Sequence, residues 1–355
     1  MSEVQRTANV IGLGLIGGSI ASGLRQRGWR IHGDDAAADA IDEALSLDVI
    51  DAAGLDPDAD ITFVAVPVVS VIDQVKRALA ETNGVVTDVG SVKSIVARAC
   101  DDPRFVGSHP MAGSELDGLG GADPEMFAGA VWVVTPLPTT HDMTLAKVTS
   151  VLRVLDAEVV ALTPEHHDEV VAVVSHVPHL AAATLMRLAV AHAEEHAPLL
   201  RLAAGGFRDM TRIASGRPDM WLDICSQNRT AIVAALDDLI GGLSAMRDIV
   251  ADDDRSRLQA ELSEAREART NLPSRVVHPE ELVEVRIRIP DRTGAAAEVF
   301  TLAADLGVNI ANFEVVHLAE SNRGLAVVLI DADAADVFKG GLLARGFKPS
   351  FSALS

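Results

Sequence analysis

Two short motifs place side chains suited to proton transfer where predicted strands end. Gly90-Ser91-Val92-Lys93 follows the apolar run 84–89, and Ser108-His109-Pro110 follows the run 105–107. With an ordinary pKa of about 6.5, the His109 imidazole can accept a proton from a substrate hydroxyl, and Ser91 is expected to orient the ring. The motif alone leaves open that His109 merely caps a loop.

A pair of arginines forms a second candidate site. Arg208 and Arg212 lie four residues apart in Gly205-Gly206-Phe207-Arg208-Asp209-Met210-Thr211-Arg212. Like charges at this spacing repel mildly on one helix face, so they are usually kept for an anionic partner. That partner is either Asp209 or an anionic substrate. The region 201–229 holds five arginines and three aspartates in a chain whose formal charge is −21, which favours the substrate.

A histidine cluster offers a third kind of site. His166, His167 and Asp168 precede Ser175-His176-Val177-Pro178-His179, in which two histidines lie three residues apart. No cysteine or further carboxylate completes a recognisable ligand spacing, so no metal is predicted. Histidines satisfied by hydrogen bonds within the core are the plainer alternative.

The glycine-rich segment Gly12-Leu13-Gly14-Leu15-Ile16-Gly17-Gly18 is typical of a dinucleotide-binding turn. Gly12 makes the tight turn, Gly14 admits a pyrophosphate to the backbone, and Gly17 allows close packing of helix on strand. Leu15 and Ile16 open the helix whose N-terminus holds the phosphates. A glycine turn without a nucleotide is the alternative, and the strand before it and helix after it argue against that.

An acidic residue supports the nucleotide interpretation. Asp34 and Asp35 end the second predicted strand, near the expected offset from the glycines. A carboxylate there binds the ribose 2′-hydroxyl and repels a 2′-phosphate. We assign this role to Asp35, and the sequence therefore predicts NAD rather than NADP.

The elements that must position these residues are parallel strands and crossover helices. Short β-branched runs alternate with helical patterns up to residue 164, which predicts an α/β, Rossmann-type doubly wound sheet as the first domain, 1–164. In such sheets ligands lie outside the carboxyl ends of the strands, so both proton-transfer motifs should open toward the nicotinamide. The predicted strands are 8–12, 29–33, 61–66, 84–89, 105–107 and 130–135.

Beyond residue 164 the patterns change twice. Helical spacing over 170–193, 226–250 and 258–268 predicts an all-helical domain at 165–272, and a Pro-containing linker follows at 273–280. Residues 281–355 then read strand, helix, strand, strand, helix, strand, the ferredoxin-like split βαβ order of a small α+β domain.

Composition excludes several classes of function. The 355 residues suffice for two to three domains, and 51 acidic against 30 basic residues disfavour nucleic-acid binding. The absence of tyrosine excludes mechanisms that need a tyrosyl hydroxyl. Cys100 and Cys225 form no CxxC pair, so a cytoplasmic location is expected. Five glycines in 7–24 argue against a secretory leader there, and no other segment is expected to span a membrane.

Taken together, the motifs resemble those of the prephenate/arogenate dehydrogenase family. The resemblance runs from residue 8 to about 250 and depends most on Ser108-His109-Pro110-Met111-Ala112-Gly113 and on the arginine block. It implies oxidative decarboxylation of a cyclohexadienyl acid in tyrosine biosynthesis, with NAD as cofactor and a homodimer built by the helical domain.

The resemblance also implies roles for individual residues. His109 is similar to the family's catalytic histidine and Ser91 to its serine partner. The substrate-binding positions are Arg212, which holds a carboxylate, His179, Ser175, the basic Arg208, which a partner subunit can supply, and the acidic Glu115. Asp34 departs from the family, because relatives often carry an aromatic or neutral residue before the ribose acid.

The C-terminal segment resembles an ACT domain, a module that often binds amino acids. Asp291, Arg292 and Gly294 form its first strand-to-helix turn, and Asn309 enters its second strand. We expect these residues to bind an effector such as tyrosine, and a purely structural or dimerising domain is the alternative.

Three other functions stay open from the sequence. Arogenate dehydrogenase differs only in the substrate's amino group, where prephenate has a keto oxygen. A non-catalytic sensor of NAD and amino acids would not need a base beside the nicotinamide. A 3-hydroxyacid dehydrogenase shares the nucleotide domain but predicts neither the paired arginines nor the C-terminal domain.

Overall fold

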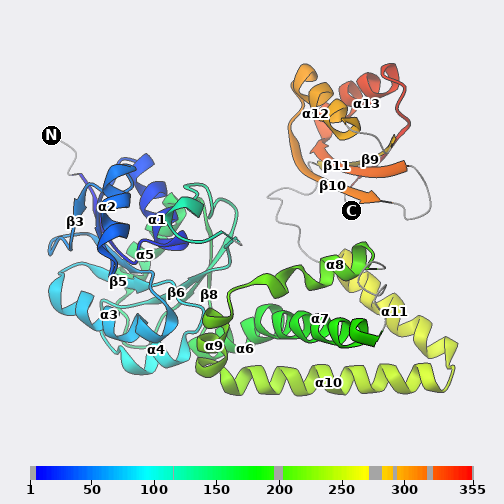
Figure 1. Ribbon diagram of the computed structural model, residues 1–355. Helices are drawn as coiled ribbons and strands as arrows, with labels where there is room; N and C mark the ends of the chain where they lie inside the picture. Colours follow the sequence, from blue (N-terminus) through cyan, green and yellow to red (C-terminus); the bar gives the residue numbers. More distant parts are fainter. Residues whose placement is uncertain are drawn as a thin grey trace. The chain divides into compact units, whose positions relative to one another are not determined.

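The computed structural model describes residues 5–114, 116–195, 203–271, 282–290, 294–317 and 323–353 (Figure 1). Its chain forms two compact units, one of Met1–Met186 with Ile213–Glu261 and one of Arg187–Arg212 with Leu262–Ser355. The predicted linker 273–280 lies outside the described residues, and the predicted domain boundaries remain predictions.

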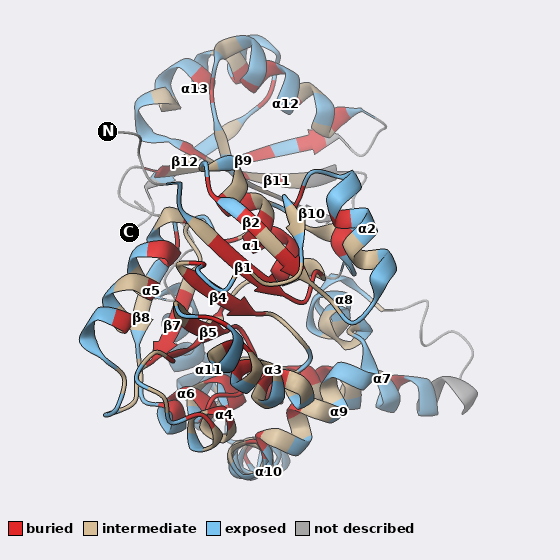
Figure 2. Cartoon of the chain, turned by 90° about the vertical axis from the view of Figure 1, so that its left-hand side faces the viewer, coloured by how far each residue is buried: buried red, intermediate tan, exposed pale blue. Residues whose placement is uncertain are grey.

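A five-stranded parallel sheet dominates the first unit. Its order is β3-β2-β1-β4-β5, the order of a dinucleotide-binding fold. Figure 2 shows β1 and β4 as buried, and all four residues of β4 are inaccessible, as its unbroken apolar run predicts. The strands are β1 (Thr7–Ile11), β2 (Arg30–Asp34), β3 (Ala52–Ala53), β4 (Ile61–Val64) and β5 (Val85–Asp88).

Helices connect these strands and bury an apolar stripe against them. Ile20 and Leu24 of α1 and Val71 and Val75 of α3 are fully buried in two clusters that include sheet residues. This burial is the main force that holds the sheet between its helices. The helices are α1 (Leu15–Gln26), α2 (Ala38–Ser46), α3 (Val68–Glu81) and α4 (Ser94–Ala99). The prediction of a doubly wound α/β sheet is confirmed.

The strand that carries His109 differs from the prediction. The run 105–107 was expected to be a parallel strand, but Phe105 makes a single parallel bridge to Val86 and the strand β6 begins at Gly107. β6 (Gly107–Pro110) pairs antiparallel with β7 (Val131–Thr135), which pairs with β8 (Glu158–Ala161), a strand the sequence pattern missed. His109 therefore lies within an antiparallel strand and not beyond a parallel one. The helix α5 (Asp142–Val154) joins β7 to β8.

From residue 164 to residue 270 the described chain is helical, as predicted. Thr163 caps α6, and a π-helical turn over Ala172–His176 joins α6 to α7. That turn lies just before Pro178, which lacks the N–H that a regular helix would use. The helices are α6 (Pro164–Val171), α7 (Val177–Glu195), α8 (Gly205–Thr211), α9 (Pro218–Gln227), α10 (Arg229–Ala251) and α11 (Arg255–Thr270).

One helical run meets the length and hydropathy of a membrane span, contrary to the expectation from sequence. It covers Pro164–Ala191 in the described part of the chain. Its buried side chains include His167, Asp168 and His176, which hydrogen-bond within the first unit. Such polar contacts are typical of a core helix in a globular protein.

The C-terminal segment has the predicted split βαβ order. Its antiparallel sheet runs β10-β11-β9-β12 around a core that includes Val285, Ala326 and Phe338. Gly294, before α12, has a φ of +88°, which favours glycine. Asn309 is exposed, and Asp291 and Arg292 lie outside the described residues. The elements are β9 (Leu282–Pro290), α12 (Ala295–Leu306), β10 (Ile310–His317), β11 (Arg323–Asp331), α13 (Ala335–Ala344) and β12 (Pro349–Ala353).

Candidate active site

The glycine loop between β1 and α1 is built by close contacts of the backbone. Gly12 has a φ of +94°, and a Cβ there would clash with the carbonyl of Ala65. A Cβ on Gly17 would clash with the carbonyl of Gly12, whereas Gly14 has no atom within 4 Å of that position. Gly12 and Gly17 are therefore fixed by packing, and Gly14 leaves open space at the start of α1.

A cavity of about 560 Å³ lies at this loop. It is lined by Gly12 and Gly14, by Asp34 and Asp35 at the end of β2, and by residues 65–67 after β4. The carboxyl ends of neighbouring parallel strands thus meet there, beside the amides of the α1 N-terminus, which Leu15 and Ile16 begin. An open glycine, the amides of a helix N-terminus and acidic residues suit the pyrophosphate and ribose of NAD.

The two acidic residues of this cavity have different partners. Asp35 accepts hydrogen bonds from the backbone amides of Leu13 (2.7 Å) and Ala37 (2.9 Å), so it fixes the glycine loop as well as facing the cavity. Asp34 is paired with Arg77 of α3, whose Nη1 lies 2.6 Å from Oδ2. Sequence reasoning missed Arg77, because no motif connects residues 43 positions apart.

His109 is hydrogen-bonded to a second histidine. Its Nδ1 lies 2.9 Å from Nε2 of His167, and the two rings meet edge to face with centroids 5.1 Å apart. Burial, together with the neighbouring His167, lowers the pKa of His109 well below its ordinary value. The imidazole is therefore neutral at pH 7, which is the state that a general base needs. Ser91 is half-buried in the β5–α4 loop, and its role as a partner of His109 remains a prediction.

Asp168 is the third member of this chain of contacts. Its Oδ1 lies 2.9 Å from Nδ1 of His167 and accepts the amide of Lys93 at 2.8 Å, and its Oδ2 accepts the amide of Ser94 at 2.9 Å. Burial pushes the pKa of Asp168 up, but the hydrogen bonds from His167 and the two amides outweigh it and leave the pKa below its ordinary value. The carboxylate therefore stays ionised.

A buried ion pair lies under the same loop. The ammonium of Lys93 pairs with Asp88 at the end of β5 and donates to the carbonyl of Ser108 at 2.8 Å, and both side chains of the pair are inaccessible. Ser108 Oγ donates to the carbonyl of Asp88 at 2.7 Å. These contacts hold the loop that carries Ser91 against β6, the strand that carries His109.

Two further histidines, His176 and His179, pack around the ring of Trp221. His179 stacks on Trp221 with centroids 3.6 Å apart, and His176 meets the same ring edge-on. Asn228 Nδ2 donates to Nδ1 of His176 at 3.3 Å. Ser175 is half-buried in the π-helical turn. Among the residues that the structure describes, no three acidic, cysteine or histidine side chains converge as a metal site.

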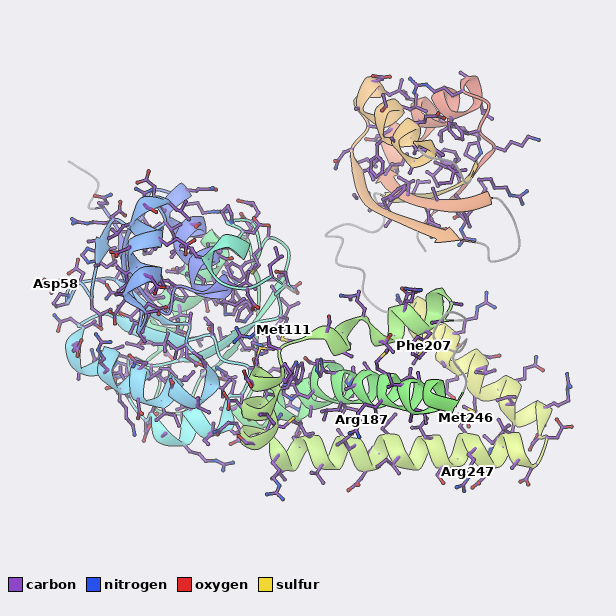
Figure 3. The ribbon with its side chains drawn as sticks, viewed as in Figure 1. Asp58, Met111, Arg187, Phe207, Met246 and Arg247 are labelled. Carbon is purple, nitrogen blue, oxygen red and sulfur yellow. The ribbon has the colours of Figure 1, made fainter. Side chains whose placement is uncertain are left out.

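The predicted arginines lie elsewhere in the chain. Arg208 is exposed on α8, the helix on which Figure 3 labels Phe207, and Arg212 is exposed at its end. Both belong to the second compact unit. Glu115 lies outside the described residues. Their roles as substrate ligands remain predictions.

Comparisons with known proteins agree with this architecture. Residues 20–175 match the family model of the prephenate dehydrogenase nucleotide-binding domain, and residues 163–264 match the prephenate dehydrogenase dimerization domain. A prephenate dehydrogenase of Bacillus subtilis (strain 168) is 32% identical over 94% of each chain.

Solved structures show the same likeness. The prephenate dehydrogenase from A. aeolicus in complex with hydroxyphenyl propionate and NAD+ superposes with a TM-score of 0.72 at 28% identity, over 77% of this chain and all of the other. Synechocystis arogenate dehydrogenase gives a TM-score of 0.65 at 29% identity, over 74% and 98% of the two chains.

The glycine loop, the parallel sheet and the helical domain define an NAD-binding oxidoreductase. More closely, the chain belongs to the prephenate dehydrogenase family. Its dimerization domain indicates a homodimer, and the exposed apolar side chains of Val233, Ile240 and Leu243 on α10 suit such an interface.

Acidification is expected to destabilise the first unit through His176. Burial lowers the pKa of this side chain from 6.5 to about 4. Between these values the unfolded chain binds a proton that the folded chain does not, so the free energy of unfolding is highest above pH 6.5 and falls toward pH 4. Urea unfolding at pH 7.5 and 4.5 should show a loss of about 2–3 kcal/mol from this residue, with His109 and His167 adding in the same sense.

Two variants test this assignment: His176→Gln removes the buried histidine, and His166→Gln removes an exposed one as the control. The first should reduce the dependence of unfolding on pH, and the second should leave it unchanged. Equal pH dependence in His176→Gln and the wild type would contradict the assignment.

Proposed function

We propose that the protein is an NAD-dependent prephenate dehydrogenase that converts prephenate to 4-hydroxyphenylpyruvate and CO2 in tyrosine biosynthesis, in the cytoplasm. The observation that carries this proposal is the neutral, half-buried imidazole of His109, held at Nδ1 by His167. Its Nε2 accepts the proton of the ring 4-hydroxyl, a step that general bases accelerate about 100-fold to 10,000-fold. Bound NAD would supply the acceptor for the hydride.

The substrate's acid groups need cationic and polar partners. Arg212 holds one carboxylate, with Arg208, His179, Ser175 and Glu115 around the remaining groups and Ser91 beside the base. The second carboxylate is lost as CO2, because its departure makes the ring aromatic. The name of the B. subtilis relative supports prephenate as the substrate, and the Synechocystis structure keeps arogenate as the alternative. Assays with both substrates, each with NAD and NADP, separate the two.

Replacement of the proposed base should slow the chemical step and spare cofactor binding. We expect His109→Asn to lower kcat by about 100-fold or more while the Kd for NAD stays within about twofold, because His109 does not line the nucleotide cavity. Steady-state kinetics and calorimetry with NAD measure the two quantities. Turnover close to that of the wild type would reject the role of His109 and leave the non-catalytic sensor as the better proposal.

The Asp34–Arg77 pair should determine the choice between NAD and NADP. Both residues line the cavity together with Asp35, which is the proposed partner of the ribose 2′-hydroxyl, and Asp34 neutralises the guanidinium of Arg77. In Asp34→Ala, Nη1 of Arg77 is released to bind a 2′-phosphate while Nε stays paired with Glu81 at 3.2 Å. One charge-assisted hydrogen bond of about 1.5–3 kcal/mol then raises kcat/KM with NADP by about 10-fold to 100-fold.

Two variants control this experiment. Asp34→Ala combined with Arg77→Ala should lose the gain, and Asp48→Ala, which removes an exposed partner of Arg25 away from the cavity, should not change the preference. An unchanged NADP/NAD ratio in Asp34→Ala would refute the role of the pair.

For the C-terminal βαββαβ segment we propose an ACT-like regulatory function, with tyrosine as effector. Gly294 and Asn309, with Asp291 and Arg292, are the proposed ligand residues. The full chain should be inhibited by tyrosine, and a chain ended after residue 271 should keep activity and lose this inhibition. Inhibition that survives the truncation would assign the effector site to the remaining domains or leave the C-terminal domain a structural role.

A further inference from the structure

His109, His167 and Asp168 form a chain of two hydrogen bonds. His167 is completely inaccessible, and both of its ring nitrogens have partners: Asp168 at Nδ1 and His109 at Nε2, each at 2.9 Å. In the chemistry proposed above, His167 only holds the ring of His109, and Asp168 has no role. They lie on α6, whereas His109 lies on β6, 58 residues earlier in the chain.

The chemistry of the partners fixes where the protons are. An ionised carboxylate only accepts, so His167 must carry its proton on Nδ1. Burial lowers the pKa of His167, and the neutral ring then has a lone pair on Nε2. The proton between the two histidines therefore belongs to His109 Nδ1, which donates to His167. By elimination, Nε2 of the neutral His109 ring carries the lone pair.

We propose that His167 and Asp168 form a positioning dyad that selects the Nδ1–H tautomer of His109, so that Nε2 is the basic atom, and that stabilises the imidazolium formed when Nε2 takes a proton. The base role of His109 itself rests on the proposed function. The arrangement parallels the use of a carboxylate to orient a catalytic histidine, with one imidazole inserted between the two.

The proton transfer balances without any further reactant. The O–H bond of the substrate hydroxyl breaks, its proton forms an N–H bond at His109 Nε2, and the oxygen keeps the electron pair. The new imidazolium still donates from Nδ1 to His167, whose own Nδ1–H points to the negative charge of Asp168. The positive charge is thus placed two hydrogen bonds from a buried carboxylate, where the low local dielectric strengthens the attraction.

A merely structural role for His167 accounts for less of the geometry. Asp168 already joins α6 to the β5–α4 loop through the amides of Lys93 and Ser94, so that connection does not need the imidazole. A buried ring nitrogen without a partner costs about 1–3 kcal/mol. Nε2 of His167 avoids this cost through His109, and the two side chains thus depend on each other.

The direct test is the tautomer of His109 in the full-length protein. Nitrogen-15 NMR of histidine-labelled protein distinguishes a protonated ring nitrogen from one with a lone pair, and the spectrum of His109→Asn identifies the signals of His109. We expect a protonated Nδ1 and an unprotonated Nε2 near pH 7.5. A protonated Nε2 would overturn the dyad, while activity loss in His109→Asn would still support the proposed function.

Kinetics of two variants give a second readout. His167→Leu removes the acceptor and should lower kcat at least 10-fold with KM within about threefold, whereas His167→Gln offers a side-chain oxygen and should recover most of that loss. The neighbouring exposed residue provides the control, His166→Leu, which should match the wild type. Wild-type kcat in His167→Leu, or equal losses in folded Leu and Gln variants, would overturn the proposal. If His167→Leu does not fold, the tautomer of the wild type decides.

Discussion

One buried carboxylate, that of Asp168, connects the elements on which the candidate active site depends. Its two oxygens bind the amides of Lys93 and Ser94 and the imidazole of His167, and its backbone carbonyl accepts from Asn228 of the α9–α10 junction. An ionised group in a protein interior is stable only when it is fully hydrogen-bonded. The same bonds that keep Asp168 charged therefore fix α6 against the β5–α4 loop.

A second buried charge pair reinforces this arrangement from the other side. Lys93 pairs with Asp88 and also binds the carbonyl of Ser108, the residue before His109. Removing one member of such a pair leaves an uncompensated charge, which typically costs about 3–5 kcal/mol. The loop that carries Ser91 is thus held at both ends: Asp88 binds the amide of Gly90, and Asp168 binds the amides of Lys93 and Ser94. A rigid loop of this kind suits a site in which a base must stay aligned.

Local sequence patterns predicted the helices and strands well, but they did not predict the long-range contacts between them. The parallel strands, the glycine loop and the C-terminal βαββαβ order follow from periodicity and turn residues, which act over a few positions. β3 and β8 were missed, and β3 has only two residues. β6 was displaced because antiparallel pairing with β7, a long-range contact, decides where it begins.

In the site, too, local features were predicted and long-range contacts were not. Gly12 has the positive φ of the predicted tight turn, and Gly17 makes the predicted close approach at the start of α1. The sequence analysis placed His167 and Asp168 in a histidine cluster, with core hydrogen bonds as the plainer alternative to a metal site, and it did not single out Arg77. His167 contacts His109 and Arg77 contacts Asp34, at separations of 58 and 43 positions, and no spacing rule reaches so far. Adjacent His and Asp residues at a helix start are the signal that should prompt a search for a second histidine.

The most direct test of the whole account is a crystal structure of the protein bound to NAD and 4-hydroxyphenylpyruvate. The account predicts that Nε2 of His109 lies within about 3.2 Å of the phenolic oxygen, with Nδ1 still on His167. A complex in which neither imidazole nitrogen is within hydrogen-bond reach of that oxygen, or in which another side chain binds it, would contradict the central claim.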